Sequence, residues 1–145
     1  MNLIYYPDER LKKKSEEISS FNKSIKHIIK GLLDNIGGGV GISAPQLGIN
    51  KRILIYLDEF YKPKVMINPI ITSAYGGKKE MEEGCLSCPG EFVLIERDDV
   101  IEVKYKDEYF INKTKTFEGI VARIIQHEID HLEGICIVDY VKQNN

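Results

Sequence analysis

The sequence predicts an α+β fold in which mixed or antiparallel sheets surround one buried helix. Two stretches carry apolar residues at helical spacing, and several short runs rich in branched residues are typical of strands. Strands and helices do not alternate in the way that builds a parallel sheet. The 145 residues contain no linker, repeat or low-complexity tract, so we expect one domain over residues 1–145.

The first predicted helix begins near Phe21, with Ser19 and Ser20 as candidate caps, and ends at the glycines at 37–39. Its apolar residues recur every three or four positions: Ile25, Ile28, Ile29, Leu32, Leu33 and Ile36. This spacing predicts an amphipathic helix with one face against the core. His27 lies off that face, so we expect it to be exposed and not to bind a ligand.

Four strands are expected between this helix and the next. Residues 52–57 and 65–68 are rich in branched side chains, and Asn68 and Pro69 are expected to end the second run. Residues 92–95 and 100–105 are predicted to form two further strands. In the last of them, alternate side chains should face opposite sides of the sheet, with Ile101, Val103 and Tyr105 together.

A second helix is predicted over residues 119–132. Its apolar residues lie around most of the circumference: Ile120, Val121, Ala122, Ile124, Ile125 and Ile129. A helix that is apolar on nearly every side is expected to be buried.

The charge pattern excludes several function classes. Lys and Arg number 20 against 22 Asp and Glu, for a net charge of −2, and the one basic run is at residues 12–14. Nucleic acid is therefore not an expected partner. The longest unbroken apolar stretch, residues 53–57, is too short to cross a membrane, and the start lacks a signal-peptide pattern. We expect a cytoplasmic protein whose three cysteines are reduced.

The second helix contains Gln126-His127-Glu128-Ile129-Asp130-His131. Residues four apart on a helix lie about 40° apart around it and about 6 Å along it, so both imidazoles can converge on one ion. Glu128 is positioned to reach a water at that ion. Two unpaired imidazoles and a carboxylate are costly on an apolar helix, so the pattern predicts a metal.

The remaining metal ligands are expected from Cys85 and Cys88, which stand in a Cys-x-x-Cys arrangement. A redox pair is disfavoured by the Pro-Gly that follows. Both thiolates could close a structural site with the two histidines, or one thiolate could leave a position open for water. Glu128 favours the open site, because a general base needs a water to act on. Cys136 lies in an apolar run and is expected to be a core residue.

A glycine-rich segment at residues 37–48 is the third candidate. Its Gly-x-Gly-x-x-Ala pattern resembles a dinucleotide fingerprint but follows a helix and meets Pro45, which is the wrong context. A functional interpretation is a bare backbone along which an extended ligand lies, with Gln46 presenting an N–H to an oxyanion. A simple helix stop followed by a turn is the alternative.

Taken together, these segments resemble the peptide deformylase family. The family's three motifs match Gly39-Val40-Gly41-Ile42-Ser43-Ala44-Pro45-Gln46, then Glu83-Gly84-Cys85-Leu86-Ser87, then the segment from Gln126 to His131, in the family's order. Similarity continues through residues 7–11, 67–69 and 139–140. The resemblance implies hydrolysis of the formyl group from N-formylmethionine at the start of nascent polypeptides, with release of formate.

The resemblance also implies residue roles. Cys85, His127 and His131 would bind one divalent metal ion, and Glu128 would be the acid/base. The Gln46 side chain and the Leu86 backbone N–H would stabilise the oxyanion. An extended substrate with its methionine in an apolar pocket would contact Val40, Gly41, Met81, Gly84, Ile120 and Ile124.

Ligand chemistry and the family resemblance favour different metals. Ligand softness and the general affinity order favour zinc, whereas the resemblance implies Fe²⁺ as the physiological ion. We expect Fe²⁺, with Zn²⁺, Ni²⁺ or Co²⁺ able to replace it in a purified sample.

Three features depart from the family pattern. Ser43 stands where alanine is usual, and Cys88 replaces an aliphatic residue. The chain ends fourteen residues after His131, so association with ribosomes through a longer basic helix is left open, and we expect a monomer. Two rival functions use the same residues: a zinc endoprotease, and a non-catalytic peptide-binding module with a closed metal site.

Overall fold

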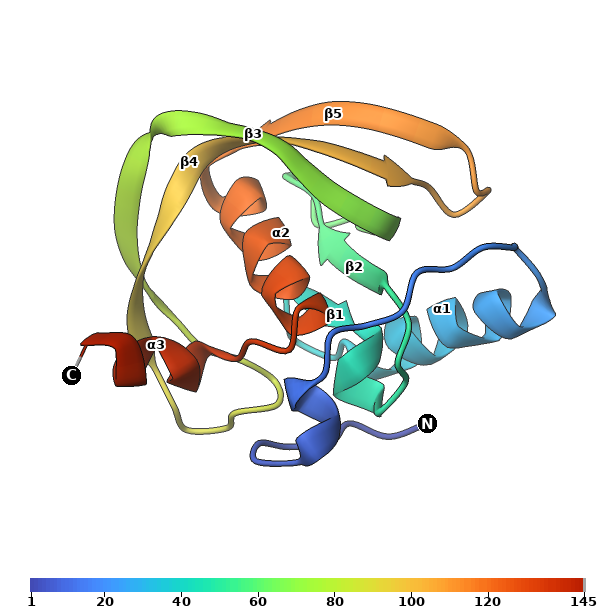
Figure 1. The fold of residues 1–145 in the computed structure, drawn as a ribbon, viewed down its shortest axis with the longest axis horizontal. Helices are drawn as coiled ribbons and strands as arrows, with labels where there is room; N and C mark the ends of the chain where they lie inside the picture. The colour runs from blue at the N-terminus through green and yellow to red at the C-terminus, as the bar shows by residue number, and fades with distance from the viewer. Residues whose placement is uncertain (145) are drawn as a thin grey trace.

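The computed structural model describes residues 1–144, in which one five-stranded sheet bends around helix α2 (Figure 1). The strand order is β1-β2-β3-β4-β5, and every neighbouring pair is antiparallel. The α+β prediction is confirmed. The elements are η1 (Glu9–Lys12), α1 (Lys23–Asn35), β1 (Gly41–Ser43), η2 (Ala44–Leu47), β2 (Ile53–Leu57), β3 (Pro63–Glu83), β4 (Val93–Lys106), β5 (Asn112–Glu118), α2 (Gly119–Leu132) and α3 (Ile137–Asn144).

Helix α2 lies inside the curve of the sheet, as its apolar circumference predicts. It packs against β1, β2, β4 and β5. Its buried residues Ala122, Ile125 and Leu132 share one core cluster with Leu54 and Ile101 from the sheet. Because apolar side chains of the sheet pack around this helix, its few polar residues are held in fixed directions. Ile120 is the exception among its isoleucines, since it is 55 % exposed.

Helix α1 covers another part of the sheet through the apolar face that the sequence predicts. Its buried residues Ile25, Ile28 and Leu32 pack with residues of β1, β2 and β3. The predicted caps Ser19 and Ser20 are wrong. The Asn22 side chain caps the helix instead, by accepting a hydrogen bond from the backbone N–H of Ile25 at 3.2 Å. The predicted exposure of His27 is confirmed.

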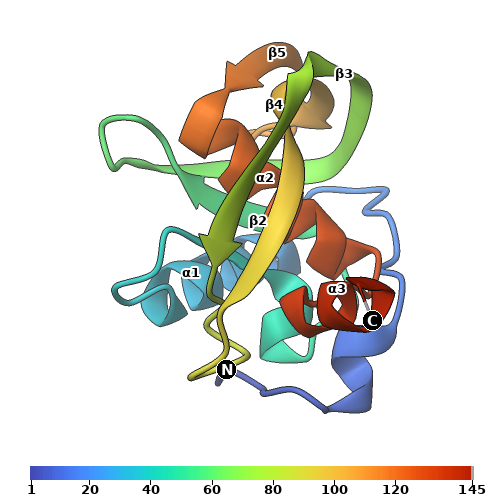
Figure 2. The same cartoon turned by 90° about the vertical axis from the view of Figure 1, so that its left-hand side faces the viewer.

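Strands β3 and β4 are longer than predicted and form a bent ribbon (Figure 2). Pro69 does not end a strand. The register instead shifts between Ile67 and Ile70, where Asn68 has a φ of 52° and its side chain bonds the backbone N–H and C=O of Ile18 at 2.9 and 2.8 Å. The two strands predicted at 92–95 and 100–105 are parts of β4.

The connection between β3 and β4, residues 84–92, lies against the N-terminal segment and the start of α3. The backbone N–H of Tyr6 donates to the carbonyl of Ser87 at 2.9 Å, and Ile4 donates to Gln46 at 2.8 Å. A separate core cluster joins the N-terminal segment, the connection, β4 and the start of α3; its buried residues are Leu11, Cys88, Val93, Ile95, Cys136 and Ile137. The placement of Cys136 in a core is thus confirmed. This packing holds the connection next to the C-terminal half of α2.

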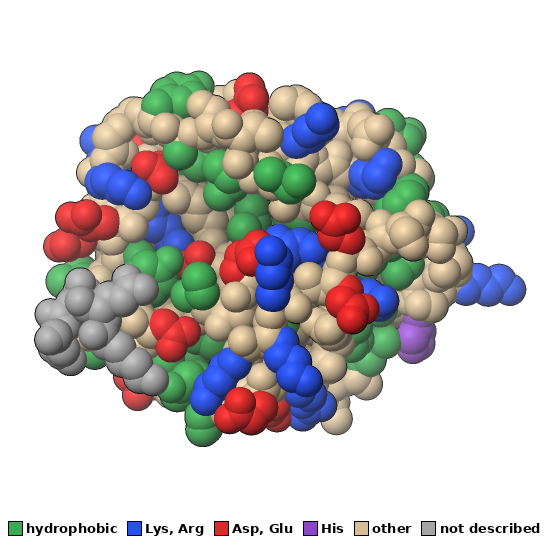
Figure 3. Space-filling view, viewed as in Figure 1, with side chains coloured by type: hydrophobic (Ala, Val, Ile, Leu, Met, Phe, Trp, Pro, Cys, Tyr) green, Lys and Arg blue, Asp and Glu red, His purple; other side chains and the backbone are tan. Residues whose placement is uncertain are grey.

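The surface carries charges of both signs. On the face shown in Figure 3, Lys and Arg side chains are interspersed with Asp and Glu. Within the described part of the chain, no helix is long and apolar enough to cross a membrane.

Candidate active site

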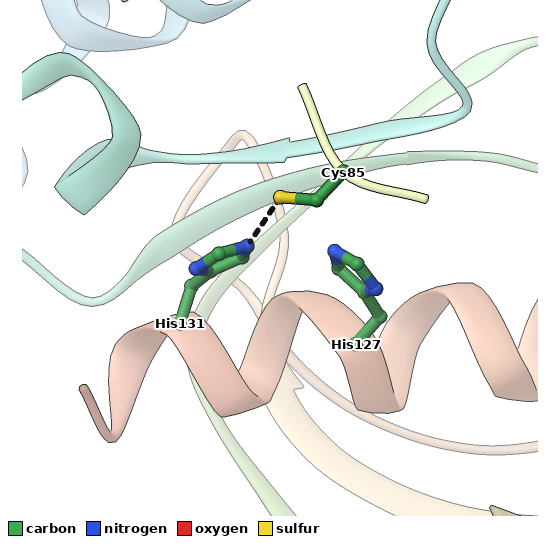
Figure 4. Close-up of side chains that lie close together, drawn as sticks. All are labelled: Cys85, His127 and His131. Carbon is green, nitrogen blue, oxygen red and sulfur yellow. Dashed lines mark hydrogen bonds between the residues drawn. The ribbon is translucent and has the colours of Figure 1, made fainter. Parts of the chain in front are cut away.

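Helix α2 and the β3–β4 connection bring three ligand-type side chains together. His127 and His131 stand one turn apart on α2 and face the sulfur of Cys85 (Figure 4). His131 Nε2 lies 3.3 Å from Cys85 Sγ, and the ring centroids of the histidines are 5.1 Å apart. One donor atom from each residue lies within 4.8 Å of those from the other two. Cys88 does not belong to this group, so the geometry favours a three-ligand site over the closed four-ligand one.

Glu83 orients His127 from the side away from this group. Its Oε1 lies 2.9 Å from His127 Nδ1, and both of its oxygens accept hydrogen bonds from Arg97, at 2.6 and 2.9 Å. Burial opposes the ionisation of Glu83, but the hydrogen bonds from His127 and Arg97 outweigh it and lower its pKa to about 2. An ionised carboxylate only accepts, so Nδ1 carries a hydrogen, and Nε2 is the ring nitrogen left to bind a metal.

Arg97 and Arg123 complete this arrangement, and neither was identified from the sequence. Arg123 Nη1 donates to Glu83 Oε2 at 2.6 Å, and Arg97 Nη1 donates to Asp130 at 2.9 Å. Both arginines are buried. Glu83 precedes Cys85 by two residues within the same motif, which is a signal that it serves the site. Arg97 carries no such signal, because only the pairing of β3 with β4 brings it to Glu83.

Glu128 is buried beside the group and lacks a partner on one oxygen. It is 4 % exposed, its Oε1 has no hydrogen bond, and its Oε2 lies 3.9 Å from His127 Nε2. Burial raises its pKa to about 7. That value suits a side chain that takes and returns a proton near neutral pH.

Gln46 is held with its amide N–H pointing at the site. Its Oε1 accepts hydrogen bonds from the backbone N–H of Ser43 at 2.9 Å and from the Ser43 hydroxyl at 3.1 Å. Its Nε2 lies 3.1 Å from Ser87 Oγ and 3.8 Å from Cys85 Sγ. The hydroxyl that replaces the usual alanine therefore helps to orient this side chain.

His131 is fully enclosed between two sulfurs. Its Nδ1 lies 4.0 Å from Cys136 Sγ, on the opposite edge of the ring from Cys85. Burial lowers its pKa well below the usual value. The imidazole is therefore neutral, which is the form that binds a metal.

A pocket of about 230 Å³ opens above these residues. All six residues predicted to contact substrate line it: Val40, Gly41, Met81, Gly84, Ile120 and Ile124. Gln46, Cys85, Leu86, His127 and Glu128 line it as well. Val40, Met81 and Ile120 are 44–55 % exposed, so they present apolar surface to the opening rather than filling a core.

The residues present fit a divalent metal ion. Sulfur and imidazole nitrogen are ligands for zinc and other late first-row divalent ions, and three of them leave a fourth position open. Glu128, whose Oε2 lies 3.9 Å from His127 Nε2, keeps its Oε1 buried without a partner, and an unsatisfied carboxylate oxygen is costly there. Three converging donors with a buried glutamate and an apolar pocket beside them form the kind of site that metal-dependent hydrolases use.

Comparison with known proteins gives the particular family. The polypeptide deformylase family model matches residues 1–145. A peptide deformylase of Pelodictyon phaeoclathratiforme is 40 % identical, over 97 % of this chain and 78 % of the relative. The solved peptide deformylase from Synechococcus elongatus in complex with actinonin superposes with a TM-score of 0.91 at 37 % identity, over 96 % of this chain and 77 % of that one. A probable peptide deformylase from Synechococcus phage S-SSM7 gives 0.90 at 34 % identity, over 97 % and 99 %. The chain belongs to the polypeptide deformylase family.

Proposed function

We propose that this protein is a single catalytic domain, residues 1–145, that hydrolyses the formyl group from N-formylmethionine of nascent polypeptides and releases formate. The observation that carries the proposal is the unpartnered Oε1 of Glu128, buried next to the three converging donors of Cys85, His127 and His131. Family membership supports the same reaction. We further propose that the protein acts as a cytoplasmic monomer.

The three donors would hold one divalent ion, for which we propose Fe²⁺ as the physiological metal, with Zn²⁺, Ni²⁺ or Co²⁺ able to replace it. When bound, such an ion lowers the pKa of a water and polarises a carbonyl. The hydrogen bond between Nδ1 of His127 and Glu83 fixes the ring so that Nε2 is the nitrogen that would bind the ion.

Each remaining residue then has a step that its position supports. Glu128 Oε1 accepts a proton from the attacking water and later returns it to the leaving amine, as its pKa of about 7 allows. Gln46 Nε2 and the backbone N–H of Leu86 donate to the developing oxyanion. Donors of this kind contribute about 3–4 kcal/mol each in other enzymes.

Substrate would lie extended between the edge at Gly41 and the connection at Gly84. The lack of a side chain at Gly41 lets the backbone of β1 lie close to Glu128, since a Cβ there would lie 2.7 Å from Glu128 Oε2. The exposed apolar surface of Val40, Met81 and Ile120 suits a methionine side chain.

The experiment is formate release from formyl-Met-Ala-Ser by anaerobically purified protein, compared with the acetylated peptide and with an unmodified protein substrate. A deformylase releases formate and leaves internal peptide bonds intact. Cleavage of internal bonds would favour the endoprotease, and binding of the formyl peptide without formate release at any metal loading would favour the non-catalytic module.

A further inference from the structure

Two of the three cysteines lie at opposite edges of the His131 ring, with Cys85 Sγ 3.3 Å from Nε2 and Cys136 Sγ 4.0 Å from Nδ1. Cys88 belongs to the same core cluster as Cys136, and Cys85 packs against that cluster. The Cys88 thiol interacts with the thiols of both, and none of the three is in a disulfide. Cys85 and Cys88 share a turn in which the backbone N–H of Cys88 donates to the carbonyl of Cys85 at 3.1 Å. Cys136 comes from the short segment between α2 and α3, and it packs with Cys88 in the same core cluster. The proposed ligand therefore has two neighbouring thiols that the reaction does not use.

The three thiols differ in what they contact. Cys85 Sγ faces His131 Nε2 and belongs to the converging group of donors. Cys136 Sγ faces the other ring nitrogen, Nδ1, at 4.0 Å, and neither Cys88 nor Cys136 belongs to a group of three donors within 4.8 Å in the described part of the chain. A second metal site is thus not supported. Cys88 and Cys136 remain as two thiols in one core cluster, and two neighbouring thiols can be oxidised to a disulfide.

The surface gives access to one member of the pair. Cys88 is only 3 % exposed, but it lines two surface hollows of about 390 and 270 Å³. Tyr5, Pro89 and Val138 border the first, and Gly39, Leu86 and Phe92 border the second. Cys136 lines neither hollow. A small oxidant therefore reaches Cys88 before Cys136. Cys85 also lines the second hollow, and the ion that it would bind is what keeps it from reacting first.

We propose that Cys88 and Cys136 form a modification site at which a peroxide produces a disulfide while Cys85 stays with the other two metal ligands. Bond formation itself does not depend on the proposed function, whereas its effect on turnover rests on it. The site differs from the metal site in its residues, although the two share the His131 ring as a neighbour.

The chemistry needs two thiols and one hydrogen peroxide. The Cys88 sulfur attacks one peroxide oxygen, the O–O bond breaks, and the departing oxygen leaves as water after taking the thiol proton, giving a sulfenic acid. The Cys136 sulfur then attacks the Cys88 sulfur, the S–O bond breaks, and a second water leaves with the Cys136 proton. The two thiols lose two electrons in total, and the peroxide gains them.

The disulfide would tie the connection at 84–92 to the segment that follows α2. It requires the two sulfurs, which pack in one core cluster, to approach to about 2.05 Å, so both segments must shift. Cys85 lies three residues before one sulfur, and the other contacts the ring of His131. We expect kcat to fall about tenfold, less than the roughly 100-fold that a 1 Å misplacement can cause. A thiol reductant should restore it.

The test uses the full chain loaded with Ni²⁺, so that oxidation of ferrous iron does not contribute. The protein is treated with hydrogen peroxide, its remaining thiols are alkylated after metal removal, and its peptides are mapped without reduction. We expect a peptide linked through Cys88 and Cys136, an alkylated Cys85, and an unchanged metal content before the chelation step. A Cys85–Cys88 link, oxidation of Cys85 before Cys88, or the absence of any link would each overturn the proposal.

Matched variants separate the two thiols. Cys136→Val should stop the reaction at the sulfenic acid of Cys88, which dimedone traps, and Cys88→Val should abolish both products. Equal dimedone labelling of the wild type and Cys136→Val would contradict the assigned order. The peptide map of the oxidised wild-type protein requires no variant, so it tests the Cys88–Cys136 link even if a variant fails to fold. Formate release by the untreated protein tests the proposed function separately, since a disulfide can form whether or not formate is released.

Discussion

Gly41→Ala is the substitution that tests most closely how the glycine-rich segment serves the site. A Cβ at Gly41 would lie 2.7 Å from Glu128 Oε2, 3.0 Å from Glu128 Cγ and 3.0 Å from Ile124 Cγ2. Contacts below 3.0 Å are not tolerated, so a neighbour must move. The nearest atom is the end of a flexible side chain, so we expect the Glu128 carboxylate to move rather than the strand.

The expected losses of stability and of kcat depend on which atom moves to make room for the new Cβ. Overpacking that a side chain can relieve costs about 1 kcal/mol of unfolding free energy, equivalent to a fall in Tm of roughly 2–4 °C for a chain of this size. Displacing the acid/base by about 1 Å should lower kcat about 100-fold, which is about 2.7 kcal/mol of transition-state stabilisation. None of the three atoms nearest to the added Cβ belongs to a proposed metal ligand, so metal content should stay at the wild-type level.

The assay is formate release with kcat and KM determined separately, together with Tm and metal content. Gly38→Ala is the matched control in the same segment, because a Cβ there meets no atom within 4 Å. We expect that control to stay within about 0.5 kcal/mol of the wild type and to keep its turnover. Wild-type kcat in Gly41→Ala, or an equal loss in both variants, would refute the argument that this glycine is required by Glu128.

Three further predictions concern the supports of the site. Glu83→Gln leaves the buried Arg97 and Arg123 without their shared carboxylate, so the unfolding free energy should fall by about 3–5 kcal/mol and metal affinity by about 10–100-fold. Thermal unfolding measures the first effect and a chelator competition the second. Unchanged metal affinity would show that Glu83 does not support the site. Ser43→Ala deletes one of the two hydrogen bonds to Gln46 Oε1, so kcat should fall by about fivefold with metal content unchanged, while a loss of metal would contradict this role. Metal removal should abolish turnover and lower Tm without unfolding the chain, because the two larger core clusters contain none of the three proposed ligands. Loss of the far-ultraviolet circular dichroism signal on chelation would instead show that the fold depends on the ion.

Local patterns predicted helix α2 and its chemistry well. The apolar circumference and the spacing of His127 and His131 are properties of one continuous helix, so they can be read without knowledge of the partners. The bounds at 119–132 agree with α2. Cys85, Cys88 and Gln46 were candidates from the residues themselves. The choice of Cys85 over Cys88, and the placement of Gln46 at the same site, came from the family resemblance, because nothing local links three segments so far apart.

Elements with little apolar alternation were not predicted. Strand β5 has the sequence Asn-Lys-Thr-Lys-Thr-Phe-Glu and is exposed along most of its length, so its pairing with β4 alone makes it a strand. The far part of β3 is exposed too, and Gly76 and Gly77, both at positive φ, lie within a register shift. Tertiary pairing decides these segments, and their sequence carries little of the information.

The polar support of the site was missed for a related reason. Arg97 lies on β4, where its alternation with apolar neighbours is that of any strand residue. It reaches Glu83 because β3 and β4 are paired, with Lys79 opposite Arg97 in the register. Cys88 was considered as a second metal ligand and as a departure from the family pattern, and its packing with Cys136 in one core cluster became visible once α2 was placed against the connection at 84–92.

The central claim is that Glu128 performs the proton transfers at a site whose ion is held by three other residues. Formate release from formyl-Met-Ala-Ser by wild type and Glu128→Gln, each at matched and measured metal content, tests it most directly. The substitution keeps the shape of the side chain and removes its capacity to take a proton. We expect one metal ion per chain in both proteins and a loss of kcat of about 10²–10⁴-fold in the variant. Wild-type turnover by Glu128→Gln at full metal loading would contradict the account.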